Sequence, residues 1–161
     1  MKKLLLPLLL GTMIFTSCEK KAETVAFDSE TAKKEIENWN QSFEAVVKNK
    51  DSVGFANLYA EDAVRMGPNA PETKGKANIL KSVVGPFKVI GSTKLTLVDA
   101  WGDNQTITST GYYEHFSPEG NSMEKGKYMG VLKRVNGKLI SVRDIWNSDT
   151  PVTIPATPPA Q

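Results

Sequence analysis

Apolar residues recur every three or four positions in the first half of the chain, which is the spacing of amphipathic helices. A short helix is predicted after Asp51 or Ser52, and another over about residues 76–84. The longest predicted helix precedes these two, and Asp28 or Ser29 can cap its start. The stripe of that first helix consists of Ala32, Ile36, Trp39, Phe43, Val46 and Val47.

From Thr93 onward the apolar period changes to two, which is typical of strands. Asn136-Gly137 is a strong signal for a two-residue hairpin turn, and a further short strand is expected at 62–66. Helices followed by an antiparallel meander predict an α+β fold, with the helices packed on one face of the sheet. The main strands are expected at 93–101, 105–116, 123–135 and 138–147.

The first residues have the pattern of a secretory signal peptide. Lys2 and Lys3 precede an apolar run over 4–15, which is shorter than the roughly 20 residues that a membrane span needs. The run ends in Phe-Thr-Ser before Cys18, the single cysteine of the chain. This ending resembles a lipoprotein box, although Phe15 stands where Leu is usual. We therefore expect residues 1–17 to be removed and Cys18 to be acylated, which would attach the protein to a membrane.

Charge and composition divide the remainder. Without the two lysines of the signal, 18 of the 20 basic residues remain against 18 acidic ones, so nothing favours binding to nucleic acid. We expect a polar tether at 18–28, one folded domain at 29–149 and a Pro-rich tail at 150–161. The residue after the cysteine is Glu19 rather than the Asp associated with inner-membrane retention, which favours the outer membrane of the cell envelope.

Several short motifs then occur in a familiar order. Asn49-Lys50-Asp51 leads through 58–64 (LYAEDAV) into a strand, Gly75-Lys76 opens the third helix, and 143–149 (RDIWNSD) closes the domain. This order resembles the nuclear transport factor 2-like superfamily, particularly its SnoaL-like and ketosteroid isomerase-like members. The resemblance implies a cone-shaped fold in which a curved antiparallel sheet and about three helices enclose a pocket. It also implies a homodimer through the outer face of the sheet.

The resemblance does not extend to the isomerase chemistry. Ketosteroid isomerases use a carboxylate base and a tyrosine in the oxyanion hole. Counting along the shared motifs puts Phe43 at the tyrosine position and Gly67 at the position of the base. Neither residue has the required group, so we expect no ketosteroid isomerase activity.

The last hairpin suggests a different site. If the strands around Asn136-Gly137 pair without interruption, alternate residues share the face that looks into the pocket. Asp144 would then lie near Lys127 and form a dyad that binds a polar group or moves a proton; a solvated pair at the rim of the sheet is the alternative. The pocket residues expected from this face and from the resemblance are Trp146, Val142, Met129, Val131, Phe43, Trp39 and Met66.

Two classes of function remain open. The first is a membrane-attached, non-catalytic pocket that binds a small apolar or amphipathic molecule or a partner protein. The second is an isomerase, dehydratase or cyclase that uses Asp144 and Lys127. A third interpretation, in which the pocket is vestigial and the sheet mediates assembly, also fits the sequence. His115 is the single histidine, and without a set of metal ligands beside it we expect it at the rim, with no metal and no cofactor.

Overall fold

The computed structural model describes residues 26–151. The proposed signal peptide, Cys18, most of the tether and nearly all of the Pro-rich tail therefore lie outside the described residues. Within residues 26–151, no helix is long and apolar enough to cross a membrane.

Within residues 26–151, three α-helices form where the apolar pattern predicts them. Helix α1 (Ser29–Lys48) begins after Asp28, whose carboxylate accepts hydrogen bonds from the backbone N–H groups of Glu30 and Thr31. Helix α2 (Ser52–Asn57) is capped in the same way by Asp51, and helix α3 (Lys76–Val83) follows Gly75, whose φ is 82°. A 3₁₀ turn, η1 (Pro86–Lys88), was not expected from the sequence.

The strands of the described part of the chain form one six-stranded sheet in the order β2-β1-β6-β5-β4-β3. Neighbouring strands are antiparallel except β1 and β6, which run parallel, so the sheet is mixed rather than wholly antiparallel. The two-residue strand β2 was also not expected from the sequence. The bounds are β1 (Tyr59–Met66), β2 (Thr73–Lys74), β3 (Ser92–Gly102), β4 (Thr106–Phe116), β5 (Ser122–Val135) and β6 (Lys138–Ser148).

A β-bulge in β6 changes which side chains share a face. The hairpin turn forms as predicted, with Val135 opposite Lys138 and positive φ at both turn residues. Farther from the turn, Leu132 pairs with Ser141 but Val131 pairs with Arg143, so one extra residue is accommodated in β6. The prediction of uninterrupted pairing is therefore wrong beyond this point.

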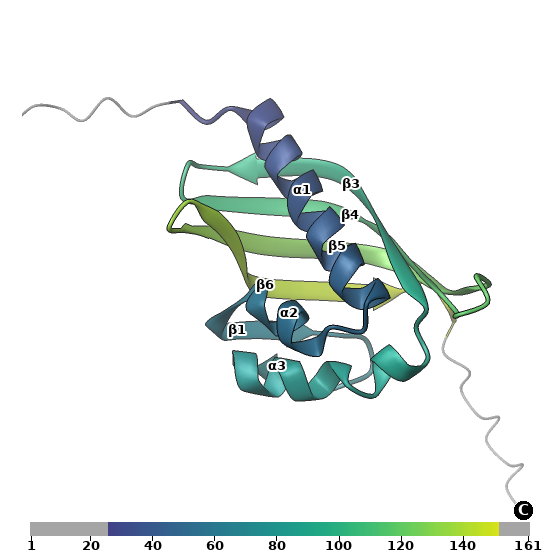
Figure 1. Ribbon diagram of the computed structural model, residues 1–161. Coiled ribbons are helices and arrows are strands. Elements are labelled where there is room, and N and C mark those ends of the chain that lie inside the picture. Colours follow the sequence, from purple (N-terminus) through teal and green to yellow (C-terminus); the bar gives the residue numbers. More distant parts are fainter. Residues whose placement is uncertain (1–25, 152–161) are drawn as a thin grey trace, which may run out of the picture.

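The helices all lie on one side of the sheet (Figure 1). Helix α1 crosses the inner face, whereas α2 and α3 lie beside β1 at the opposite side of the sheet from β3. One buried cluster, which includes Phe55, Tyr59 and Ile79, joins the end of α1 to α2 and α3. A second, which includes Ile36, Ile107 and Leu132, joins the start of α1 to the sheet. The α+β fold with helices on one face is as predicted.

Candidate functional site

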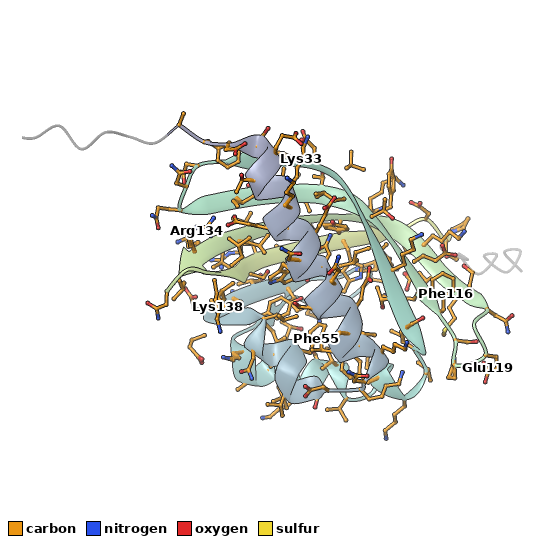
Figure 2. All side chains as sticks on the ribbon, turned by 45° about the horizontal axis from the view of Figure 1, so that its top comes forward. Lys33, Phe55, Phe116, Glu119, Arg134 and Lys138 are labelled. Carbon is orange, nitrogen blue, oxygen red and sulfur yellow. The ribbon has the colours of Figure 1, made fainter. Side chains whose placement is uncertain are left out.

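A cavity of about 490 Å³ lies between the helices and the inner face of the sheet. This volume is in the range of small-molecule sites. Its wall is mainly apolar and includes Trp39 and Phe43 from α1, Phe55 from α2 and Trp146 from β6. Figure 2 shows Phe55 where α2 meets the end of α1, away from the β5–β6 hairpin that Arg134 and Lys138 mark.

Arg65 is the cationic side chain of the described cavity wall. Its guanidinium carbon lies 4.6 Å from the ring centre of Trp146, 5.0 Å from that of Phe55 and 5.5 Å from that of Tyr59. Only 14% of its side chain is exposed. Aromatic rings at these distances attract a cation through the negative charge density of their faces. Three rings therefore hold the guanidinium at the edge of the cavity.

Asp144 supplies the counter-charge. One of its oxygens, Oδ2, accepts a hydrogen bond from Nε of Arg65 at 3.2 Å and another from the hydroxyl of Tyr59 at 2.9 Å. Strands β1 and β6 pair in parallel with Arg65 directly opposite Asp144, which explains why the side chains meet. The Asp144 side chain is 17% exposed. The hydroxyl of Tyr59 also interacts with the guanidinium of Arg65.

Burial sets the protonation of this cluster. It raises the pKa of Tyr59 well above its ordinary value, so the phenol stays neutral and donates to Asp144. Burial alone would lower the pKa of Arg65, but Tyr59 and Asp144 favour its charged form, and the pKa rises. The cluster is thus a guanidinium–carboxylate pair braced by a neutral phenol.

The expected dyad of Asp144 and Lys127 is wrong. Because of the bulge, Asp144 lies opposite Gly130 rather than Met129. Lys127 lies opposite Asn147 and pairs with the carboxylate of Asp149, with 55% of its side chain exposed. The two members of the expected dyad therefore lie on opposite faces of the sheet.

The bulge also changes the expected pocket wall. Asp144, Trp146, Trp39 and Phe43 do line the cavity, and their roles toward a ligand stay predictions. The other expected pocket residues, Met129, Val131, Val142 and Met66, are absent from its described wall. Met129 instead lies on the outer face, 43% exposed, in an apolar groove that also contains Val98, Tyr112 and Ile145.

The two positions that lack isomerase groups both lie on the cavity wall. Phe43 packs against Phe55, with 5.0 Å between the ring centres. At Gly67 a Cβ atom would come within 2.5 Å of the Trp146 ring, so even the first atom of an aspartate side chain would collide with it. Trp146 thus occupies the space that a side chain at position 67 would need.

A second polar group lies on strands β3, β4 and β5. Thr93, Tyr113, His115 and Glu124 all line the cavity. Oγ1 of Thr93 is 2.7 Å from Nδ1 of His115, and the hydroxyl of Tyr113 donates to Glu124 at 3.0 Å. Burial and the bond to Glu124 raise the pKa of Tyr113. His115 therefore lies in the cavity wall, not at a solvated rim as expected from the sequence.

The pKa of His115 is lowered. Burial is the largest cause, Glu124 opposes it, and the charge of Arg65 adds to it. Arg65 thus belongs to the surroundings that favour the neutral imidazole. At neutral pH the imidazole is consequently uncharged.

A third polar contact joins α1 to the sheet. The amide nitrogen of Asn40 donates to the hydroxyl of Tyr128 at 3.3 Å, which leaves the phenol proton of Tyr128 free to donate elsewhere. Burial raises the pKa of Tyr128, so this proton is retained. Among the described residues, Nε1 of Trp39 and Oδ1 of Asn40 are buried without a hydrogen-bond partner.

The charges of the wall limit what it can hold. The described wall contains one guanidinium, that of Arg65, and two carboxylates, those of Asp144 and Glu124. An anion would therefore enter a cavity with an excess of negative charge. No group of three or more metal-ligating side chains occurs within residues 26–151.

Sequence reasoning missed Arg65, Tyr59, Glu124 and the position of His115. Arg65 lies in a short strand where the alternation of apolar and polar residues is weak. The signal that would have revealed it is the pairing of that strand with the last one. This pairing is parallel and joins residues about 80 positions apart, as in the bond between Arg65 and Asp144.

The comparisons with known proteins agree with this architecture. An NTF2-like protein with a cystatin-like fold from Novosphingobium aromaticivorans superposes with a TM-score of 0.68 at 14% identity, over 76% of this chain and 85% of that one. A ketosteroid isomerase-like protein from Erwinia carotovora atroseptica gives 0.64 at 17% identity, over 78% and 100%. A protein of unknown function with a cystatin-like fold from Nostoc punctiforme gives 0.63 at 18% identity, over 78% and 93%.

At these identities the solved structures establish the shared fold alone. Among curated proteins none is significantly similar to the chain. The family model of the SnoaL-like domain matches residues 39–142, which is more than half of the chain; Asp144 and Trp146 lie just beyond the matched range. The chain therefore belongs to the SnoaL-like domain family.

Proposed function

We propose that the cavity binds one small, neutral, amphipathic molecule, with its apolar body against the aromatic wall and an acceptor oxygen at Arg65. The observation that carries this proposal is the arrangement around Arg65. Its guanidinium is held by three rings and by Asp144, which accepts from Nε alone, and a guanidinium carries five N–H donors, so donors remain for a ligand. Donors fixed in this way at an apolar cavity favour a ligand with one oxygen acceptor.

The preference for a neutral molecule follows from the charges. Asp144 already neutralises Arg65, and Glu124 adds a second carboxylate to the same wall. A carboxylate ligand would lose its strong hydration and meet this excess of negative charge, whereas a ketone oxygen loses far less hydration and accepts from Arg65 without repulsion.

A matched pair of probes tests this preference. We expect 2-acetylnaphthalene, a neutral ketone, to bind with one-to-one stoichiometry in a fluorescence titration. 2-Naphthoate has nearly the same shape but carries a charge, and it should bind at least about tenfold more weakly, which corresponds to 1.4 kcal/mol. Equal or tighter binding of the anion would contradict the proposed ligand class.

We further propose that the protein is exported and attached to the cell envelope through an acylated Cys18. The support is the charged and apolar leader that ends at the single cysteine. Labelling of cells with a palmitate analogue should tag the wild-type protein and leave Cys18→Ala untagged. Equal labelling of the two proteins would contradict the anchor. The outer membrane is the proposed destination, which fractionation of labelled membranes tests.

A further inference from the structure

The second polar group of the cavity allows a more specific statement about the ligand, which rests on the proposed function. The starting point is the hydroxyl of Thr93. This residue is only 5% exposed, and among the described residues the sole hydrogen-bond partner of its hydroxyl is Nδ1 of His115 at 2.7 Å. A buried hydroxyl that does not donate its proton carries a substantial free-energy cost. The assignment that satisfies this hydroxyl within the described residues has Thr93 donating and Nδ1 of His115 accepting.

This assignment determines the tautomer of the imidazole. A neutral histidine carries one ring proton, and if Nδ1 is an acceptor that proton is on Nε2. Among the described residues, no hydrogen bond involves Nε2 of His115, although the residue lines the cavity. The neutral side chain thus presents an N–H donor that is available to a ligand.

Glu124 supplies an acceptor beside this donor. Glu124 and His115 are directly opposite on strands β5 and β4, and both line the cavity, so their side chains are neighbours on the inner face. Oε1 of Glu124 accepts from Tyr113, and among the described residues Oε2 makes no hydrogen bond. A donor and a charged acceptor therefore lie side by side in the same part of the wall.

We infer that His115 and Glu124 form a subsite for a hydroxyl group of the ligand. A hydroxyl accepts from Nε2–H of His115 and donates to Glu124 through a single oxygen atom. A carboxylate would be repelled by Glu124, and a carbonyl would leave Glu124 unpaired. An ammonium would leave the donor of His115 unpaired. The ligand class is thus a neutral, apolar molecule that carries a hydroxyl at the His115 end and a carbonyl-type oxygen at Arg65.

The first test needs no ligand. Because His115 is the only histidine of the chain, a ¹⁵N–¹H correlation spectrum of the imidazole reports on this residue alone. We expect a protonated Nε2 and an unprotonated Nδ1 at pH 7. A proton on Nδ1, or on both nitrogens, would overturn the inference.

The second test compares 2-acetylnaphthalene with its isomers that carry one hydroxyl on the distant ring. At least one isomer should bind about tenfold more tightly than the parent, as expected for a hydrogen bond to a charged group. His115→Phe should abolish this gain, so that the parent and its hydroxylated isomers bind to this variant with equal affinity. Tyr112→Phe, which removes a hydroxyl from an exposed position on the outer face of the same strand, should retain the gain.

The outcomes separate the two proposals. If the parent ketone binds but no hydroxylated isomer gains affinity, or if His115→Phe retains the gain, the hydroxyl subsite is wrong and the proposed function stands. If neither the parent nor any isomer binds, the proposed function is wrong and the inference falls with it.

Discussion

Replacing Arg65 by methionine should destabilise the protein by about 3 kcal/mol. The substitution removes the guanidinium and leaves Asp144, 17% exposed, without its counter-charge. Breaking a buried ion pair from one side typically costs about 3–5 kcal/mol. The hydroxyl of Tyr59 still donates to Asp144 at 2.9 Å, and methionine retains part of the contact with the three rings, so the lower end of this range applies.

A double-mutant cycle separates the ion pair from other losses. Asp144→Asn keeps an acceptor for Tyr59 but leaves Arg65 without a counter-charge, so it should also cost about 3 kcal/mol. In the double variant neither charge remains, and the total cost should be at least about 2 kcal/mol below the sum of the two single costs. The measurement is equilibrium unfolding in urea, with the midpoint and slope fitted for all four proteins.

Lys127→Met is the matched control. It removes a cation from an ion pair too, but 55% of Lys127 and 44% of Asp149 are exposed, and such pairs contribute about 0–1 kcal/mol. If Arg65→Met costs no more than Lys127→Met, or if the two costs in the cycle add, then Arg65 and Asp144 are not the buried pair that we describe.

Three further expectations follow. Because burial lowers the pKa of His115 below its ordinary value of 6.5, the unfolded chain binds a proton at a higher pH than the folded protein does. The free energy of unfolding should therefore decrease as the pH falls below about 6.5. A His115→Gln variant should show a smaller decrease, and an equal dependence of the unfolding free energy on pH in the two proteins would contradict the burial of His115. We propose that the expected homodimer uses the outer groove around Met129 and Ile145; sedimentation should show a wild-type dimer that Met129→Lys shifts to monomer, and a monomeric wild type would exclude it. With Phe43 and Gly67 in place, a β,γ-unsaturated ketosteroid should not be turned over above background, and robust turnover would show that our residue matching is wrong.

Much of the fold could be predicted because it depends on local patterns. The stripe of α1, its cap and that of α2, and the Asn136-Gly137 turn are all encoded within a few neighbouring residues. The stripe and the turn form as predicted, and each cap is the first of the two residues that the sequence allowed, Asp28 and Asp51. The site depends on two features that local patterns do not contain. The parallel pairing of β1 with β6 brings Arg65 to Asp144.

The second feature is the bulge near Val142, which breaks the period of two. A shift of one residue moves every later side chain to the opposite face. Trp146 and Asp144 reach the cavity with this shift, whereas the residues of β5 that uninterrupted pairing placed there, including Lys127 and Met129, lie on the other face. The bulge has no marker such as glycine at its position, so the sequence did not reveal it.

Filling the cavity tests the central claim most directly. A Cβ at Gly130 would meet its nearest atoms, on Ser109 and Leu132, at 3.5 and 3.6 Å, which is ordinary contact, and the residue lines the cavity. Gly130→Leu should therefore fold and occupy the ligand's space. In a fluorescence titration with 2-acetylnaphthalene, we expect it to lose binding, while Met129→Leu, one residue away on the outer face, binds like wild type. Undiminished binding by folded Gly130→Leu would show that the ligand site lies elsewhere.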